Sequence, residues 1–224
     1  MAVFVLVHGA WHGAWSWDRV TPLLRVAGHT VLAPELPKTS LAANVAHLAS
    51  AMAPHLQPAI VVGHSLAGIT ITALAEHVPE RIARLVYLAA FLPKNGQSVT
   101  DLMGKGGAPF IDVSPDRRSL SLKPDRVAPV LYSDCPPGDI NAILPLLTPE
   151  PAATSLARAA TTEDRFGSVP RAYIECLNDQ CIPLTLQRAM HGAMPCDPVL
   201  SLETGHCPNW SAPAKLAAML CALA

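Results

Sequence analysis

Short apolar runs alternate with helical patterns along most of the chain. The runs are rich in Val, Ile, Leu and Ala, which is typical of strands buried on both faces of a sheet. They are Val3–Val7, Thr30–Ala33, Ala59–Val62, Leu85–Ala89, Ala172–Cys176 and Val199–Leu202. Apolar positions spaced by three or four residues predict helices between them, namely a stripe of Leu41, Val45, Leu48 and Met52, and the ranges Trp17–Val26, Leu66–His77, Leu184–His191 and Ala212–Leu220. This alternation predicts an α/β fold with a mostly parallel central sheet of about six strands flanked by helices.

One long segment, from Pro93 to Val169, departs from the alternation. It is rich in Pro, Gly, Asp and Ser, and short helical patterns stand out only at Ile140–Leu147 and Ala152–Ala160. Because it is too long for a connection within a compact sheet, we expect an inserted cap at residues 93–169 between core segments 1–92 and 170–224. A mobile loop is the alternative. A cap over the carboxyl edge of the sheet would lie where open α/β sheets bind ligands.

Composition and charge narrow the class of protein. Half of the 224 residues are hydrophobic, which is enough for a full core and excludes intrinsic disorder. Sixteen basic and 17 acidic residues leave a net charge of −1, so we expect no nucleic-acid partner. The longest stretch without Asp, Glu, Lys or Arg, Thr39–Ala75, is interrupted by Pro and His, and we therefore expect no membrane span.

The N-terminus and the cysteines bear on the compartment. The first residues lack the basic region and the long apolar run of a signal peptide, so we expect a cytoplasmic protein. Six cysteines are scattered through the second half without a CxxC pair, which favours free thiols in a reducing compartment. The sequence leaves open whether the protein forms a homodimer.

The clearest chemical signal is the run from Ile60 to Gly68, in which a predicted strand leads through Gly63 and His64 into Ser65. A nucleophilic serine on a sharp strand-to-helix turn needs small residues two positions before and after it, as in G-x-S-x-G. Here Ala67 occupies the last position and Gly68 follows it. The pattern predicts Ser65 as a nucleophile, but short Gly–Ser motifs also occur by chance, so other residues must support it.

A serine hydroxyl needs a positioned base and an acid that orients it, in the chain order Ser, Asp or Glu, His. His206 follows the last predicted strand and precedes the last helix, and it is the predicted base. Asp179 follows the preceding strand and is the predicted acid, with Glu175 and Glu203 as competitors. Glu175 is expected inside a strand, and Glu203 is too close to His206 in sequence. The alternatives are a surface-loop histidine and a turn aspartate.

An oxyanion hole is expected beside the predicted nucleophile. The first strand ends in a His–Gly loop, and we predict the backbone N–H groups of Ala10 and Leu66 as its two donors. Residues close to these in sequence are expected to line the substrate pocket, namely Gly9, Trp11, His12, Phe91, Cys207 and Trp210.

Three blocks of the sequence, Val5–Trp15, Val62–Gly68 and Tyr173–Pro183, carry a family resemblance. Together with His206, they resemble the plant-type methylesterase and hydroxynitrile lyase group of the α/β-hydrolase fold. The resemblance implies an α/β-hydrolase fold and a catalytic histidine at His206. The segment Pro93–Val169 gives no comparable match.

Two positions separate the chemistries within that group. The resemblance implies that its hydroxynitrile lyases place a threonine in the first loop and a lysine beside the catalytic histidine, whereas this chain has Gly9 and Cys207. Departing cyanide requires a positive charge, which neither of these two residues supplies. We therefore expect a serine hydrolase, which cleaves small, uncharged carboxylic esters through an acyl-enzyme. We expect no metal or organic cofactor. A hydroxynitrile lyase-type C–C lyase and a non-catalytic ligand-binding protein are the alternatives.

Overall fold

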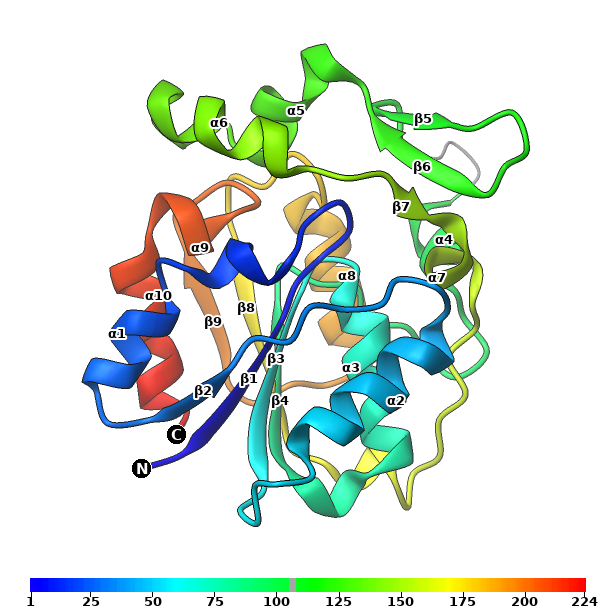
Figure 1. Cartoon of the computed structure of the whole chain (residues 1–224). Coiled ribbons are helices and arrows are strands. Elements are labelled where there is room, and N and C mark those ends of the chain that lie inside the picture. Colours follow the sequence, from blue (N-terminus) through cyan, green and yellow to red (C-terminus); the bar gives the residue numbers. More distant parts are fainter. Residues whose placement is uncertain (105–107) are drawn as a thin grey trace.

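The computed structural model describes residues 1–104 and 108–224, and its centre is a six-stranded parallel sheet (Figure 1). The strand order is β2-β1-β3-β4-β8-β9, and every neighbouring pair is parallel. The strands are β1 (Val3–Val7), β2 (Thr30–Leu32), β3 (Ala59–His64), β4 (Ile82–Leu88), β8 (Arg171–Cys176) and β9 (Val199–Leu202). Each predicted apolar run is therefore a strand, and the predicted sheet is confirmed.

Helices cover both faces of this sheet (Figure 1). On one face, α1 (Thr21–Val26) and α10 (Pro213–Ala222) bury Leu24, Leu216 and Leu220 against it. The other face is covered by α2 (Leu41–Met52), α3 (Ala67–His77) and α8 (Leu184–Ala193). Burying one such leucine side chain contributes about 2 kcal/mol, so both layers hold the sheet edges in place.

Two predicted helices begin later than the sequence pattern suggests. The predicted helix Trp17–Val26 divides into a 3-10 turn, η1 (Ala14–Trp17), and α1, which has Pro22 in its first turn. Near the C-terminus, a short helix α9 (Pro208–Ser211) precedes α10, and the latter starts at Pro213. Proline lacks an N–H and is tolerated only in the first turn, so it marks the start of each helix.

Residues 93–169 are called segment 93–169 below. Its residues 108–156 lie across the carboxyl ends of the strands, whereas residues 157–169 run down beside α3 to the start of β8 (Figure 1). Residues 105–107, within the predicted cap, lie outside the described residues. The segment contains α4 (Val99–Met103), α5 (Pro124–Leu131), α6 (Pro137–Ile143), α7 (Ala152–Leu156), two 3-10 turns, η3 (Leu144–Leu146) and η4 (Phe166–Ser168), and an antiparallel sheet of β5 (Ile111–Val113), β6 (Ser119–Leu122) and β7 (Glu150–Pro151). A further 3-10 turn, η2 (Pro79–Arg81), precedes β4 in the core.

The sequence pattern predicted this segment only in part. The predicted helix at Ile140–Leu147 corresponds to the second half of α6 together with η3. The predicted helix Ala152–Ala160 ends at Leu156, because the chain becomes extended there and Arg158 forms an antiparallel bridge with Ser98. The small antiparallel sheet was not predicted at all.

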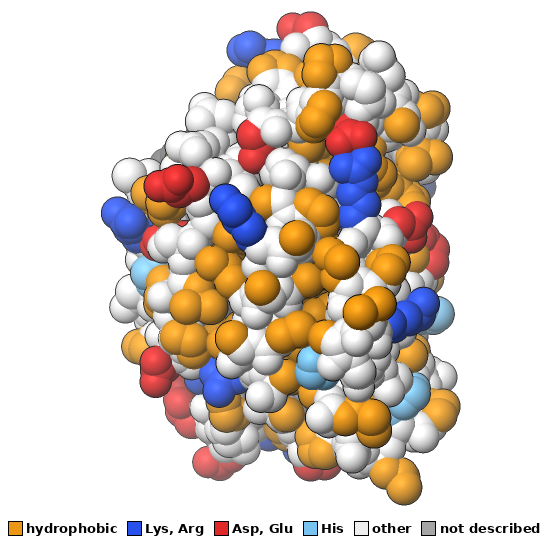
Figure 2. Space-filling view, turned by 90° about the vertical axis from the view of Figure 1, so that its left-hand side faces the viewer, with side chains coloured by type: hydrophobic (Ala, Val, Ile, Leu, Met, Phe, Trp, Pro, Cys, Tyr) orange, Lys and Arg blue, Asp and Glu red, His pale blue; other side chains and the backbone are white. Residues whose placement is uncertain are grey.

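The surface of the protein is mixed in character. On the face shown in Figure 2, Lys and Arg side chains lie scattered among Asp, Glu and hydrophobic side chains, without a patch of one sign. None of the helices in the described part of the chain is long and apolar enough to cross a membrane. All six cysteines are free.

Candidate active site

Ser65 lies on the turn between β3 and α3, at the carboxyl end of the sheet. Its φ of 57° is left-handed, a conformation that side chains other than glycine rarely adopt. Two contacts hold the turn, since the Ser65 N–H donates to Leu88 O at 3.2 Å and the Ser65 carbonyl accepts from Phe91 N at 3.1 Å. The turn has the strained geometry expected of a nucleophile elbow.

Two glycines allow other parts of the chain to approach this turn closely. A Cβ on Gly68 would lie 1.9 Å from Phe91 O, so no side chain fits at that position. The glycine that the packing requires is therefore Gly68, one residue after the motif position that Ala67 occupies. A Cβ on Gly9 would lie 2.9 Å from the Cβ of Ser65. Gly9, predicted to line the pocket, instead lets the first loop pack directly against the serine.

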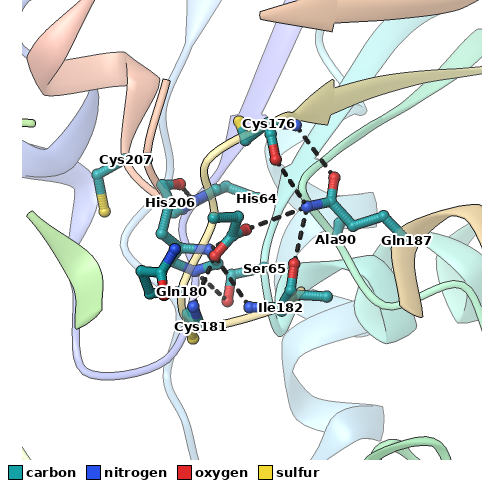
Figure 3. A network of polar contacts seen from close by, with 12 residues as sticks. His64, Ser65, Ala90, Cys176, Gln180, Cys181, Ile182, Gln187, His206 and Cys207 are labelled. Carbon is teal, nitrogen blue, oxygen red and sulfur yellow. Dashed lines mark hydrogen bonds and ion pairs between the residues drawn. The ribbon is translucent and has the colours of Figure 1, made fainter. Parts of the chain in front are cut away.

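The structure brings Ser65, His206 and Asp179 together from three loops that follow β3, β9 and β8. Figure 3 shows Ser65 and His206 at this meeting point. The Ser65 hydroxyl lies 3.0 Å from His206 Nε2, and His206 Nδ1 lies 2.8 Å from Asp179 Oδ2. Because the carboxylate can only accept, Nδ1 carries the proton and Nε2 is free to accept from the serine. These three side chains form one continuous hydrogen-bonded chain, and all are buried.

The Asp179 carboxylate is held from several sides. Its Oδ1 accepts the N–H groups of Cys181 at 2.7 Å and Ile182 at 2.9 Å. Gln187, fully buried on α8, donates its amide to Asp179 Oδ2 at 3.4 Å and to the Ile182 carbonyl at 2.8 Å. Gln187 could not be singled out from the sequence, because nothing in a helical pattern distinguishes a buried glutamine from an exposed one.

The environment of His206 combines opposing effects on its pKa. Burial disfavours the charged imidazolium, whereas the Asp179 carboxylate favours it and Cys181 acts in the same direction, so the pKa of His206 is raised above its usual value. His64, the residue before the serine, places Nε2 2.8 Å from the His206 carbonyl and so anchors the loop that carries the base. Burial lowers the pKa of His64, and this imidazole stays neutral. The sequence analysis did not assign His64 a role.

The predicted oxyanion donors lie beside Ser65. Ala10 and Leu66 line the same cavity as the serine. Neither of their backbone N–H groups has a hydrogen-bond acceptor within residues 1–104 and 108–224. Two free N–H groups beside a serine hydroxyl are what an oxyanion hole requires.

A cavity of about 560 Å³ opens above Ser65. Segment 93–169 supplies most of its wall, including Val99, Met103, Phe110, Val113, Leu120 and Leu156. Polar groups are few among the lining residues that the structure describes, and Arg117 has the one charged side chain among them. A mostly apolar cavity of this size suits a small organic molecule without charge.

Only part of the predicted pocket lines this cavity. Trp11 and Phe91 do, whereas His12 and Cys207 are buried outside the lining. Figure 3 shows Cys207 beside His206 but apart from Ser65. Trp210 packs against Trp15, with 6.1 Å between the two ring centroids, and the guanidinium of Arg19 lies over the Trp210 ring. Proximity in sequence failed here because side chains of one loop point in different directions.

Imidazoles gather near the serine without forming a metal centre. The ring centroids of His12 and His64 lie 6.1 Å apart, and those of His64 and His206 lie 4.7 Å apart. In the described part of the chain, no group of three or more His, Cys, Asp and Glu side chains could hold a metal ion.

Comparisons with known proteins agree with this architecture. The family model described as "Alpha/beta hydrolase family" matches residues 4–219. Methylesterase 1 of Arabidopsis thaliana is 32% identical over 243 residues, which cover 95% of this chain and 92% of the relative. Salicylic acid-binding protein 2 of Nicotiana tabacum is 31% identical, covering 83% of this chain and 82% of its own length. The resemblance to plant methylesterases inferred from the sequence is confirmed.

Solved structures show the same fold. A pyrethroid hydrolase from Sphingobium faniae JZ-2 superposes with a TM-score of 0.88 at 28% identity, over 99% of this chain and 96% of the other. Polyneuridine aldehyde esterase superposes with a TM-score of 0.88 at 26% identity, over 100% of this chain and 99% of the other.

Proposed function

The chain belongs to the alpha/beta hydrolase family, and from that premise we propose that it is a serine hydrolase that cleaves small, uncharged carboxylic esters. The observation that carries the proposal is the hydrogen-bonded chain from Ser65 through His206 to Asp179 at the floor of the cavity. The esterases among the relatives and structural neighbours support the same reaction class.

In the proposed reaction, the Ser65 hydroxyl attacks the ester carbonyl while His206 Nε2 takes its proton. Asp179 keeps the imidazole in the required tautomer and stabilises the imidazolium. The negative charge that forms on the carbonyl oxygen is bound by the N–H groups of Ala10 and Leu66. One such donor lowers the barrier by about 3 kcal/mol.

The second half of the reaction reverses these proton transfers. The imidazolium of His206 protonates the departing alcohol, which leaves an acyl group on Ser65. A water molecule then enters, His206 removes its proton, and the hydroxide attacks the acyl carbonyl. Collapse of this second intermediate releases the carboxylic acid and returns the proton to the serine. The steps balance without an external cofactor.

The cavity and its surroundings favour hydrolysis over cyanohydrin cleavage. Cyanide is stabilised as a leaving group by a positive charge near the base. The residue after His206 is Cys207, whose thiol is fully buried and whose pKa is raised by burial, so it supplies no charge. At Gly9 a threonine side chain would collide with Ser65. The two features that the lyases of the group require are therefore absent from these positions.

The test is release of p-nitrophenol from short-chain acyl esters by the wild type and by Ser65→Ala. We expect the substitution to lower kcat by about 10⁵-fold or more, because it removes the nucleophile. Ser168→Ala is the matched control, because Ser168 lies in segment 93–169 outside the lining of the cavity, and we expect its activity to stay within about threefold of wild type.

Three outcomes would contradict the proposal. Retained activity in Ser65→Ala would show that Ser65 is not the nucleophile. Cyanide release from a simple cyanohydrin faster than any ester turnover would favour the lyase. Ligand binding without product from any ester would favour a non-catalytic protein.

A further inference from the structure

Trp11 connects the predicted oxyanion loop to segment 93–169 through its backbone and its side chain. Its N–H donates to Glu150 Oε2 at 3.3 Å, and its carbonyl accepts from Thr148 N at 3.0 Å. The indole Nε1 donates to Leu120 O at 2.9 Å. Its φ of 64° is left-handed, which a tryptophan adopts only where surrounding contacts hold it.

The peptide group between Ala10 and Trp11 is held on its other edge as well. The Ala10 carbonyl lies 2.6 Å from His12 Nδ1, and His12 Nε2 lies 2.6 Å from the Tyr132 hydroxyl. Burial lowers the pKa of His12 to about 3, so the ring is neutral. Because a carbonyl can only accept, Nδ1 carries the proton, and Nε2 accepts from Tyr132, which follows α5 in segment 93–169.

We propose that Glu150 and the His12–Tyr132 pair are positioning residues that orient the Ala10–Trp11 peptide and with it the N–H of Ala10. The inference rests on the proposed function, in which that N–H binds the oxyanion. The Ala10 N–H belongs to the preceding planar peptide, and only φ and ψ of Ala10 join the two peptides, so holding the Ala10–Trp11 peptide in place restricts the directions in which that N–H can point. Segment 93–169 thus sets the geometry of the oxyanion hole in addition to forming the cavity wall.

Glu150 is suited to this role by its burial. Its side chain is 3% exposed, and burial raises the pKa of its carboxyl to about 7. Lys38 and His8 face it across a small void, with the Lys38 ammonium opposing the rise and His8 kept neutral because burial lowers its pKa to about 4. An ionised carboxylate accepts a stronger hydrogen bond than a protonated one, so the contact with Trp11 strengthens as pH rises through 7.

The experiment compares Glu150→Ala, which removes the acceptor, with Glu150→Gln, which keeps an acceptor of the same shape. Glu175→Gln is the matched control, because Glu175 is also 3% exposed but bonds Arg188, His191 and Ser201 away from the oxyanion loop. For each variant, kcat and KM are measured with p-nitrophenyl acetate. The affinity of a small aryl trifluoromethyl ketone, which forms a tetrahedral adduct with an active serine, is measured alongside.

We expect Glu150→Ala to lower kcat by about 30-fold with KM changed by less than about twofold, because a misdirected donor is felt mainly in the transition state. The affinity of the trifluoromethyl ketone should fall by the same factor as kcat. The kcat of Glu150→Gln should stay within about threefold of the wild-type value at pH 8. Any change of activity with pH that comes from titration of the Glu150 carboxyl should be absent from this variant. Glu175→Gln should leave kcat, KM and ketone affinity unchanged.

A second variant approaches the same peptide from its other edge. Tyr132→Phe removes the hydroxyl that fixes His12, and we expect kcat to fall by about fivefold without a change in KM. Because both contacts hold one peptide group, the effects of Tyr132→Phe and Glu150→Ala should not multiply in the double variant. If Glu150→Ala fails to fold, Tyr132→Phe combined with Glu150→Gln keeps the test decisive.

The outcomes separate the inference from the proposed function. Unchanged kcat in a folded Glu150→Ala would overturn the positioning role while leaving the esterase intact. If Glu150→Ala does not fold, unchanged kcat in Tyr132→Phe combined with Glu150→Gln would have the same meaning. A loss confined to thermal stability, as in Glu175→Gln, would overturn it too. A wild type without ester turnover, whose Ser65 does not react with a fluorophosphonate probe, would refute the proposed function and this inference with it.

Discussion

The α/β core and segment 93–169 make different contributions to the cavity above Ser65. The core supplies the serine, the imidazole and the carboxylate, each on a loop directly after a buried parallel strand. The segment supplies most of the apolar wall and the groups that hold Trp11. The reacting groups are thus tied to the central sheet, whereas the shape of the cavity depends on short elements packed above it.

The two regions also differ in how they are stabilised. The central strands β1 and β3 of the core are buried along their whole length. In the segment, β6 is only half-buried and β5 is largely exposed. Variants in the core should therefore change the reaction itself, and variants in the segment should change which substrates fit and how well the oxyanion is held.

The largest expected effect in this comparison comes from Asp179→Asn in the core. We expect kcat to fall by about 10⁴-fold, because the amide no longer holds the imidazole in the tautomer that accepts from Ser65. Without the carboxylate, the pKa of His206 falls, so the activity profile shifts to lower pH. The pH dependence of kcat/KM measures both effects.

Glu175→Gln again serves as the control for a buried carboxylate, and it should leave the profile in place. Equal losses in the two variants would contradict Asp179 as the residue that orients His206.

A smaller effect is expected from pH on the wild type. His206 must be neutral to accept the serine proton, and its pKa is raised by Asp179. The activity should therefore fall as the pH drops through that raised pKa, by about tenfold per unit below it. The measurement is kcat/KM from pH 5 to pH 9, with Glu150→Gln run in parallel to remove the carboxyl near pH 7. A flat profile across this range would contradict His206 as the base.

The smallest effect should appear in the segment. Leu156 lines the cavity and is 59% exposed, so Leu156→Ala should change substrate contact with little effect on stability. We expect kcat/KM for a long acyl ester to fall by about fivefold, equivalent to about 1 kcal/mol of apolar contact, and that for the acetate to stay unchanged. Leu146→Ala is the control, because Leu146 is 44% exposed but absent from the lining. Equal effects on both esters would show that the segment does not select the acyl chain.

Local patterns of apolar residues were sufficient to predict the strands of the core. Strands buried on both faces read as continuous apolar runs, and each predicted run is a strand. Because parallel strands end at one edge of the sheet, residues that follow them converge, which is why Ser65, Asp179 and His206 could be named before their distances were known. The roles of Gly68 and Gly9 in close packing around the serine emerged only from the distances.

Segment 93–169 could not be predicted in the same way. Its strands have three, four and two residues, too few for an alternation of apolar and polar positions to be recognised. His12 and Cys207, expected in the pocket, do not line the cavity above Ser65, because closeness in sequence does not say which way a loop side chain points.

Short-range physical chemistry in the chain was enough to identify the parallel sheet and the nucleophile turn, since strand burial and turn sterics act over a few residues. The pairing of Glu150 with Trp11 joins residues 139 positions apart, and that of Tyr132 with His12 joins residues 120 apart. Such contacts exist only once the segment has packed on the core, because their geometry depends on the positions of many elements together. The orientation of the oxyanion loop is therefore a property of the folded molecule as a whole.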